Sequence, residues 1–321
     1  MSKPQADIAG IDGDVLRYEL GAVAMAKEEL FDITVERPWP DVDVYELVDK
    51  RITEIIQAVG ANAYEVYLTG PGNYRNNVAT IKPYKGNRTG LEKPYHWETV
   101  SRRLKDKWGA ITVNGIEADD WLALRGTEEG SRYAICSRDK DLRQVPECVH
   151  YSWACGENQP AVGPFVVDGI GKVWADFKLY GVKQQKAWKL HGNGIAFFYG
   201  QLLVGDSVDN IPGCPKVGPK KASDLLGHLA SEAELYRACA YEYHRVYGDG
   251  WKEALVENAR LLHLLRSRDT MDIEVSGQEL NCVVNKLWET PDGTKIDFFG
   301  SSNADGGRVH ETLEDGLRLS L

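Results

Sequence analysis

The sequence predicts an α/β fold: a three-layer, mostly parallel sheet with helices on both faces, followed by an all-helical second half. Two patterns lead to this prediction. Short apolar strand patterns alternate with amphipathic helix patterns over the first 153 residues, and from residue 174 onward the pattern is helical only. In addition, acidic clusters follow directly after predicted strands, at the edge where parallel α/β sheets bind ligands.

The strand patterns occupy residues 6–12, 63–69, 110–113, 132–137 and 148–153. Helices are predicted at 15–27, 44–59, 95–108 and 117–124. For the helix at 44–59, Asp43 with Glu46 predicts a capping box and Gly60 predicts the end. We expect residues 28–43 to form a polar connection and residues 73–93 to form a basic, aromatic-rich loop or arch.

Helices at 174–180, 183–190, 194–204, 222–229, 231–247 and 251–267 are predicted for the second half. A turn dense in proline and glycine lies between the third and fourth of these helices, and its Gly218-Pro-Lys-Lys221 end opens the fourth. Backbone N–H groups at such a helix start suit an anion, and two lysines favour phosphate. Taken alone, the same four residues are more often an ordinary surface turn.

Composition limits the possible functions. At 321 residues the chain is long enough for about two domains. It has no apolar run of about 18 residues and no apolar signal region, so we expect neither a membrane span nor secretion. The six cysteines form no CxxC or zinc-like pattern, which favours reduced thiols in a cytoplasm.

The net charge of −10 argues against a nucleic-acid ligand at first sight. However, residues 72–107 carry nine Lys or Arg against three Asp or Glu. Such a local basic segment can still bind phosphate in an acidic protein.

Acidic side chains from distant parts of the chain are predicted to meet at one edge of the sheet. Each acid alone is more often a solvated helix start or a salt bridge, but together they would raise one another's pKa unless a counter-charge is present. Ligands that offer only oxygen favour Mg²⁺ or Mn²⁺ over zinc. Two such ions can activate a water and stabilise the leaving oxygen of a phosphodiester. The acids are Asp12, Glu117, Asp119, Asp120, Asp139, Asp141, Asp206 and Asp209.

The segment Tyr84-Lys-Gly-Asn-Arg88 supplies positive charge for the same chemistry. Lys85 and Arg88 can neutralise charge that builds up on a scissile phosphate. Aromatic rings in and near the segment can stack on unpaired bases, namely Tyr74, Tyr84, Tyr95 and Trp97. A solvated basic loop with scattered aromatic residues is the alternative interpretation.

Five motifs, in the family's order, resemble the 5′-nuclease family of flap endonucleases and bacteriophage-type 5′→3′ exonucleases, which is similar to the nuclease domain of bacterial DNA polymerase I. They are Ile11-Asp-Gly-Asp-Val-Leu16, Tyr84-Lys-Gly-Asn-Arg88, Gly115-Ile-Glu-Ala-Asp-Asp120, Ser137-Arg-Asp-Lys-Asp141, and Leu203-Val-Gly-Asp-Ser-Val-Asp-Asn-Ile-Pro-Gly213 with Val217-Gly-Pro-Lys-Lys-Ala222. The resemblance covers residues 6–267.

The resemblance implies two regions. A PIN-like metal-dependent nuclease domain would occupy residues 1–180, with the basic arch at 73–108. A helix–three-turn–helix region that binds duplex DNA would follow at 181–267. Residues 268–321 lie outside the resemblance, and because their pattern loses periodicity we expect a loosely ordered appendage of unknown role.

The resemblance also implies roles for the acids, with Mg²⁺ or Mn²⁺ as the two metal ions. The first ion would be held by Asp12, Glu117 and Asp119. The second ion would be held by Asp139, Asp141 and Asp206, with Asp120 and Asp209 supporting through water.

The remaining roles concern DNA. By the resemblance, Lys85 and Arg88 would act on the scissile phosphate, Arg75 and Tyr84 would contact DNA, and Gly218, Lys220 and Lys221 would hold the duplex. Family members often bind a monovalent cation in this hairpin, so K⁺ is a further implied ligand.

One position departs from the family pattern. The family usually has an aspartate at the end of the second strand, where this chain has Thr69-Gly70. One ligand of the first metal is therefore missing, or is replaced by water or by Thr69.

The implied function is a Mg²⁺-dependent, structure-specific 5′→3′ exonuclease or flap endonuclease that acts in replication or degradation. Its substrates would be DNA with junctions between single strand and duplex, and RNA primers in RNA–DNA hybrids. It would act in the cytoplasm, which is the host's cytoplasm for a phage-encoded protein, and a polymerase or single-strand-binding partner is left open. The alternative is a non-catalytic, structure-specific DNA-binding protein whose site is degraded by the lost aspartate. A small RNA-cleaving, toxin-like nuclease is disfavoured because such domains need no duplex clamp.

Overall fold

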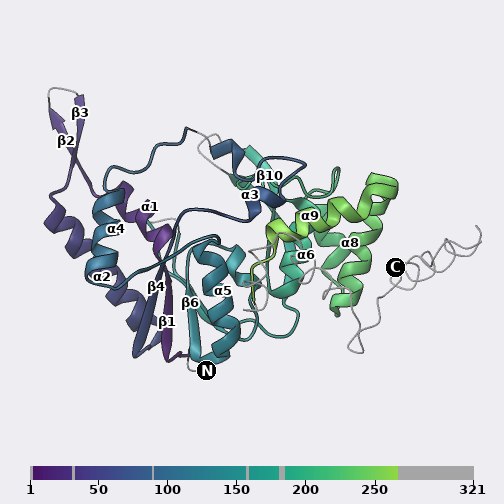
Figure 1. The fold of residues 1–321 in the computed structure, drawn as a ribbon, viewed down its shortest axis with the longest axis horizontal. Coiled ribbons are helices and arrows are strands. Elements are labelled where there is room, and N and C mark those ends of the chain that lie inside the picture. Colours follow the sequence, from purple (N-terminus) through teal and green to yellow (C-terminus); the bar gives the residue numbers. More distant parts are fainter. Residues whose placement is uncertain (1–2, 31–32, 89, 157–158, 181–184, 267–321) are drawn as a thin grey trace, which may run out of the picture. The chain divides into compact units, whose positions relative to one another are not determined.

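The structure is a computed structural model, and it describes residues 3–30, 33–88, 90–156, 159–180 and 185–266 (Figure 1). All of these residues lie in one compact unit, Met1–Glu279. The appendage predicted at residues 268–321 lies outside the described residues.

A six-stranded sheet forms the centre of the unit, as predicted. Its strands are β1 (Ile8–Asp12), β4 (Ala63–Thr69), β5 (Ile111–Val113), β6 (Tyr133–Cys136), β7 (Val149–Ser152) and β8 (Val162–Val166). They are arranged in the order β5-β4-β1-β6-β7-β8, and only β8, at one edge, runs antiparallel to its neighbour. Because β1 lies between β4 and β6, its carboxyl end lies in the middle of the sheet edge.

The helices that flank the sheet are α1 (Gly13–Val23), α2 (Asp41–Val59), α4 (Trp97–Asp106) and α5 (Ala118–Glu129). The second half contains α6 (Gly194–Val204), α7 (Pro219–Leu226), α8 (Glu232–Tyr247) and α9 (Trp251–Leu262). A short helix, α3 (Arg75–Val78), and 3₁₀ turns at Gly86–Arg88, Gly130–Arg132, Asp141–Gln144 and Gly248–Gly250 complete the described elements. None of the helices in the described ranges is long and apolar enough to cross a membrane.

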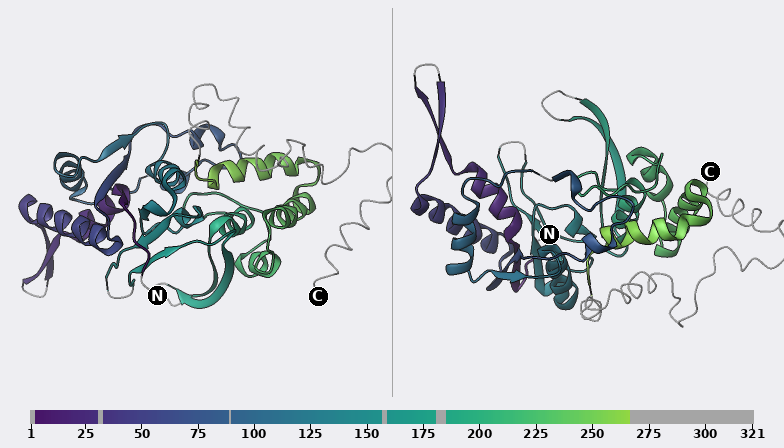
Figure 2. Two further views of the ribbon diagram at one scale, coloured as in Figure 1. Left: turned by 90° about the horizontal axis from the view of Figure 1, so that it is seen from below. Right: turned by 45° about the horizontal axis from the view of Figure 1, so that its top comes forward.

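Two antiparallel hairpins replace elements that we predicted differently. The first pairs β2 (Met25–Leu30) with β3 (Ile33–Pro38), where the end of a helix and a polar connection were predicted. The second pairs β9 (Lys172–Tyr180) with β10 (Gln185–Asn193), where two helices were predicted. In Figure 2 this second hairpin is a long twisted ribbon that leaves the body of the unit. We call it the β9–β10 ribbon.

The helix prediction for the β9–β10 ribbon was wrong because alternation was mistaken for helical spacing. Val173 is buried at the base of β9, and Trp174 beside it is exposed, which is the period of a strand. Aromatic and β-branched side chains in this segment also favour a strand over a helix.

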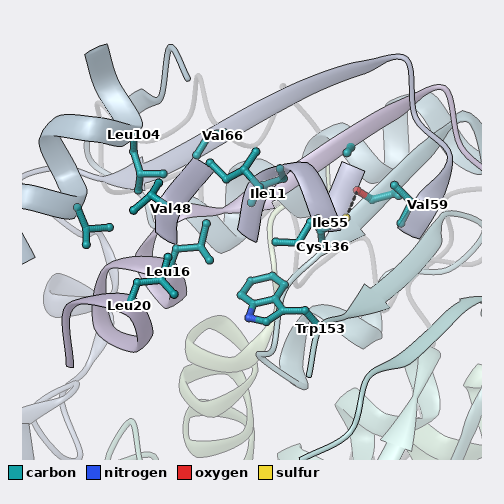
Figure 3. Packing of buried hydrophobic residues seen from close by; sticks show 14 of the residues in the cluster. Ile11, Leu16, Leu20, Val48, Ile55, Val59, Val66, Leu104, Cys136 and Trp153 are labelled. Atoms are coloured by element: carbon teal, nitrogen blue, oxygen red, sulfur yellow. Dashed lines mark hydrogen bonds between the residues drawn. The ribbon is translucent and has the colours of Figure 1, made fainter. Parts of the chain in front are cut away.

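The main core lies between the sheet and the helices α1, α2 and α4 (Figure 3). Ile11 of β1 and Val66 of β4 point to this face, where they meet Leu16 of α1 and Val48 of α2. Side chains that alternate with these face α5: the ring of Tyr67 lies 6.1 Å from that of Trp121. Helices therefore cover both faces of the sheet, as the three-layer prediction requires.

The start of helix α2 differs from its prediction, whereas its end agrees with it. It begins at Asp41 after Pro40 and has no side-chain cap, so the predicted capping box of Asp43 and Glu46 is wrong. The helix starts at Asp41, three residues earlier than predicted, which places Asp43 inside the first turn. Its end is as predicted: Gly60 has a φ of 68° and donates its N–H to Gln57 O and Ile56 O.

His150 on β7 is a buried titratable group. Its Nε2 donates to the carbonyl of Val145 at 2.7 Å, and its ring stacks on Phe165 with centroids 5.4 Å apart. Burial lowers the pKa of His150 to about 4. The folded protein therefore binds this proton more weakly than the unfolded chain, whose histidines titrate near 6.5.

We expect His150 to make stability depend on pH in a defined window. Because its folded pKa is lowered, the free energy of unfolding should fall as the pH drops from about 6.5 toward about 4. Between pH 7 and pH 5, wild type should lose about 2 kcal/mol more than the variant His150→Leu, measured by urea denaturation. The exposed His228, changed to leucine, should keep the wild-type pH dependence. Equal losses in wild type and His150→Leu would contradict this account.

Candidate active site

A cavity of about 700 Å³ lies at the carboxyl ends of the central strands. Acidic side chains from four separate parts of the chain line it: Asp12, Asp14, Glu19, Glu117, Asp119, Asp139, Asp141 and Asp209. Basic side chains also line it: Arg17, Arg75, Lys85, Arg88 and Arg138. Six of the eight acids predicted from the sequence are thus in one cavity, and Asp120 and Asp206 do not line it.

Backbone and hydroxyl groups hold the acids at the ends of β1 and β6. Asp12 caps α1, where one carboxylate oxygen accepts from the N–H of Val15 at 3.0 Å. The other oxygen accepts from Ser137 Oγ at 2.6 Å, and the same Oγ accepts from the N–H of Asp139 at 2.9 Å. Ser137 therefore joins the acid of β1 to the acid that follows β6.

The buried acids raise one another's pKa. Burial and then the charge of Asp14 raise the pKa of Asp12 to about 7. Burial and then Asp139 raise the pKa of Asp141 to about 7, and burial with Asp12 and Asp139 raises that of Asp119 well above its ordinary value. Asp119 makes no hydrogen bond or ion pair with any residue that the structure describes. This side of the cavity is therefore stabilised by any positive charge that enters it.

A lysine neutralises the acids on the other side. Lys140 Nζ lies 3.4 Å from Asp141 Oδ1 and 3.5 Å from Asp206 Oδ2, so a single cation stands between these two carboxylates. Burial lowers the pKa of Lys140, but the three surrounding acids outweigh it and raise the pKa overall. Asp206 itself is fixed by the turn after α6, where it accepts from the N–H of Val208 at 2.7 Å.

The predicted basic segment lies against this turn. The N–H of Lys85 donates to the carbonyl of Asp209 at 2.9 Å, and Asn87 donates to that of Ser207 at 2.7 Å. Lys85 Nζ is ion-paired with Glu117, and Arg88 donates to Asp209 at 2.6 Å. Lys85 and Arg88 thus both line the cavity, as expected from the sequence, and they are held there by its acids.

Glu117 lies between two cations, Arg75 and Lys85. Burial alone would raise its pKa, but Arg75 and Lys85 outweigh burial and lower it. Tyr84 also donates its hydroxyl to Glu117 at 2.8 Å and to Asp209 at 3.1 Å. Glu117 is therefore ionised and already paired.

Two residues that were predicted to contact DNA lie in the cavity wall and are bound by protein groups. The side chain of Arg75 is 2% exposed and is paired with Asp120. Tyr84 is 8% exposed, and its hydroxyl is bound to Glu117, so contact of either residue with DNA stays a prediction. Tyr74 and Trp97, which were predicted to stack in the same way, are buried, whereas Tyr95 is exposed.

Asp120 was predicted to support a metal through water, and the structure gives it another role. Arg75 donates to its two oxygens at 2.5 and 2.8 Å, in a pair that is fully buried. The N–H groups of Glu117 and Leu265 donate to the same carboxylate. Asp120 is thus saturated by protein donors and has no capacity left for a ligand.

Arg75 extends this contact to the end of α9. Its remaining N–H groups donate to the carbonyls of Leu261 at 3.0 Å and His263 at 3.1 Å. One buried ion pair therefore connects α3, the start of α5 and the segment that leaves α9.

Asp14 is a cavity acid that the sequence analysis missed. It lies in the first turn of α1, is ion-paired with Arg17, and accepts from the N–H of Thr69 at 3.1 and 3.2 Å. The signal was present in the spacing Asp12-Gly-Asp14, since a helix that starts at a strand end directs its first turn toward the same edge. Thr69, suggested as a replacement ligand, instead accepts the N–H of Ala118 with its hydroxyl.

The turn after α6 has the close backbone approach that its glycines predict. Gly205 and Gly213 have φ values of 78° and 64°, and a Cβ on either would collide with the backbone of the other strand of the turn. Helix α7 then begins at Pro219 after Gly218. Lys220 and Lys221 are both on the surface at this helix start, where they pair with Asp224 at 2.6 Å and with Glu242 at 2.7 Å.

No group of three or more His, Cys, Asp or Glu side chains in the described part of the chain is arranged to hold a metal ion as it stands. The donor chemistry nevertheless fits a hard divalent cation. The acids of the cavity offer only oxygen, and burial, then the charge of neighbouring aspartates, raises the pKa of Asp12 and Asp119.

The second half of the chain matches a known family model. Residues 198–286 match the family "5′-3′ exonuclease, C-terminal SAM fold". This segment includes the turn after α6 and helices α7 to α9.

Curated relatives match a larger part of the chain. A 5′-3′ exonuclease of Aquifex aeolicus is 30% identical over 186 residues, which are 56% of this chain and 57% of that protein. A flap endonuclease Xni of Sodalis glossinidius is 24% identical over 208 residues, 62% of this chain and 72% of that protein. The chain is therefore similar to 5′-3′ exonucleases and flap endonucleases, and it spans little more than half the length of the first of these relatives.

Solved structures with a similar arrangement include T5 5′-exonuclease with bound zinc ions and the catalytic core of Rad2 with a DNA substrate. The first is 15% identical and covers 87% of this chain and 96% of its own, with a TM-score of 0.46. The second is 12% identical and covers 84% of this chain and 77% of its own, with a TM-score of 0.40. A likeness at this level carries no argument about the chemistry of the site.

We expect the buried ion pair to be required for folding of the cavity wall. The variant Arg75→Ala leaves the carboxylate of Asp120 buried without its counter-charge, which should cost about 3–5 kcal/mol in the free energy of unfolding. Chemical denaturation measures this loss. Arg88→Ala removes a partly exposed ion pair and should cost no more than about 1 kcal/mol. A loss below about 1 kcal/mol for Arg75→Ala would show that the pair is dispensable.

Proposed function

We propose that this protein is a divalent-metal-dependent 5′-nuclease that hydrolyses phosphodiester bonds of DNA near junctions between single strand and duplex. The observation that carries the proposal is the convergence of acids from four chain segments on one cavity beside Lys85 and Arg88. The match of residues 198–286 to a 5′-3′ exonuclease model supports it.

The metal sites are part of the proposal. Asp12, Glu117 and Asp119 would hold one ion, with Asp14 as a further oxygen donor on the same side. Asp139, Asp141 and Asp206 would hold a second. When bound, such ions supply an activated water and stabilise the leaving oxygen. We propose Mg²⁺ as the ion, since all donors are oxygen, and a monovalent cation such as K⁺ in the turn after α6 stays a prediction.

The protein's own cations would act on the phosphate. Lys85 and Arg88 line the cavity and are bound to Glu117 and Asp209, so they would exchange a carboxylate partner for the scissile phosphate as the substrate enters. Positive charge placed there stabilises the charge that develops in the transition state.

Helix α7 would hold the duplex at a distance from this chemistry. Its start offers backbone N–H groups after Gly218, with the exposed Lys220 and the neighbouring Lys221. Contacts of this kind bind the sugar–phosphate backbone without reading its sequence. RNA in an RNA–DNA hybrid would be accepted for the same reason.

The proposed division of the chain is a nuclease domain followed by a duplex-binding region, with residues 268–321 outside the proposal. We move the boundary from residue 180 to about residue 171, because the β9–β10 ribbon crosses residue 180 as one hairpin. The ribbon packs on α6 and α7, so it belongs to the duplex-binding region.

The second candidate is a non-catalytic, structure-specific DNA-binding protein. Two observations favour it: no metal-holding group is formed among the described residues, and the end of β4 carries Gly70 instead of an acid. Incubation with a flapped duplex and Mn²⁺ separates the candidates, because even a weakened metal site should cut.

Asp139→Ala tests the proposed activity. The variant removes a carboxylate that lines the cavity and accepts from the N–H of Asp141, and it should lower Mg²⁺-dependent cleavage of a 5′-labelled flapped duplex by roughly a hundredfold or more. Binding of the same DNA should persist. Asp43→Asn, an exposed acid on α2, should cleave like wild type. Full cleavage by Asp139→Ala would end the proposal.

Lys140→Met tests the second metal site. Lys140 neutralises Asp141 and Asp206, so a divalent ion has to displace its charge. Without the lysine, Mg²⁺ or Mn²⁺ should bind about tenfold more tightly in calorimetric titration of the DNA-free protein. Lys105→Met on α4 should leave metal affinity unchanged. Unchanged or weaker binding in Lys140→Met would place the ion elsewhere.

A further inference from the structure

The β9–β10 ribbon displays large aromatic rings on its surface. Trp174, Phe177 and Trp188 are 46%, 50% and 40% exposed. Among the residues that the structure describes, every tryptophan and phenylalanine with this degree of exposure lies on the ribbon. Exposed apolar surface that is concentrated in one place marks an interaction site more often than scattered residues do.

Strand pairing assigns these rings to two faces. Phe177 is directly opposite Trp188, and their ring centroids are 5.3 Å apart. Trp174 is opposite His191 on the other face, with centroids 5.8 Å apart. We call the exposed pair Phe177 and Trp188 the aromatic pair.

The aromatic pair continues a face whose base is buried. Val173 and Leu190 share its face by register, and both pack toward Gly200 of α6. Toward the outer part of the ribbon this face is no longer covered by α6, and the aromatic pair is exposed there. The pair is therefore fixed on a rigid base.

Helix α7 places positive charge beside the aromatic pair. The N–H of Ala175 donates to Ser223 Oγ of α7 at 3.1 Å, which ties the ribbon to this helix. Lys220, at the start of the same helix, lies with Nζ 5.8 Å from the centroid of the Trp188 ring. The aromatic pair is thus adjacent to the helix start that holds the duplex in the proposed function.

The charge of the ribbon identifies the class of ligand. Residues 172–193 contain five lysines against one aspartate, in a chain whose net charge is −10. Of these lysines, Lys172 and Lys189 lie by register on the face of Trp174, and the cation beside the aromatic pair itself is Lys220 of α7. The aspartate, Asp176, lies 3.0 Å from Nε2 of His191. Lysine is depleted at protein–protein interfaces, whereas lysine with exposed aromatic rings is the combination that binds unpaired nucleotides.

We propose that the aromatic pair is a stacking surface for unpaired nucleotides next to the duplex held at the start of α7. The inference rests on the proposed function and goes beyond it, because it assigns the single-stranded side of the junction to the ribbon. Bases stack on the rings of Phe177 and Trp188, and Lys220 of α7, beside Trp188, neutralises the adjoining phosphate.

DNA binding without metal tests the proposal. Fluorescence anisotropy in EDTA compares a labelled duplex with a ten-nucleotide single-stranded overhang to a blunt duplex of the same sequence. The double variant Phe177→Ala/Trp188→Ala should bind the overhang DNA about tenfold or more weakly, and the blunt duplex within about threefold of wild type.

Two further variants and one direct readout sharpen the test. Trp188→Phe keeps a ring and should bind the overhang DNA nearly as well as wild type. Trp174→Ala removes an equally exposed ring from the opposite face and should have little effect. Photo-crosslinking of wild-type protein to 5-bromouridine in the overhang should map to Phe177 or Trp188 by mass spectrometry. Because this readout needs no variant, it still tests the proposal if the alanine variants fail to fold.

The outcomes separate this proposal from the one on which it rests. If wild type binds both DNAs and the double variant binds the overhang DNA unchanged, or loses both DNAs equally, the stacking surface is refuted while the nuclease proposal stands. If wild type binds neither DNA, the proposed function fails and this inference fails with it. Crosslinks confined to residues outside the ribbon would also refute it.

Discussion

The buried ion pair of Arg75 and Asp120 is the constraint on which the site depends. Asp120 lies in the first turn of α5 and accepts from the N–H of Glu117, so it fixes the residue that faces the cavity. Arg75 binds the same carboxylate and the carbonyls of Leu261 and His263. Two charged groups that are buried away from water are stable only when their donors and acceptors are hydrogen-bonded, and here protein groups provide those hydrogen bonds. The pair therefore sets the position of the sheet domain's acids relative to the helical second half.

Some acids of the cavity are paired with lysine or arginine, whereas others are not. Lys85 is paired with Glu117, Arg88 with Asp209, and Lys140 stands between Asp141 and Asp206. Asp119 forms no such ion pair among the described residues, and burial, then the charges of Asp12 and Asp139, raise its pKa. The acids of the turn after α6 are thus neutralised by the protein, whereas the acids at the end of β1 need positive charge from outside. An anionic substrate can approach such a cavity only when cations accompany it.

The sequence predicted the sheet and its acids because both follow from local pattern. A strand that ends in Asp12 and a strand that is followed by Ser137 and Asp139 reach the same edge in any parallel sheet. The pairing of Arg75 with Asp120 and of Tyr84 with Glu117 could not be predicted, because these partners lie far away in the chain and spacing does not show which acid a basic side chain will pair with. The β9–β10 ribbon was mistaken for helices because short segments that mix apolar and polar residues can fit either period.

Packing at the end of β4 leaves no room for a side chain on Gly70, where the resemblance implied an acid. A Cβ at this position would lie 2.7 Å from the carbonyl of Val113 and would collide with the side-chain oxygen of Asn114. The N–H of Gly70 donates to that same carbonyl at 2.6 Å, which holds β4 close to β5. Negative charge at this edge comes from Asp14, whose carboxylate accepts from the N–H of Thr69. The acid therefore stands on the first turn of α1, and the backbone at the end of β4 orients it.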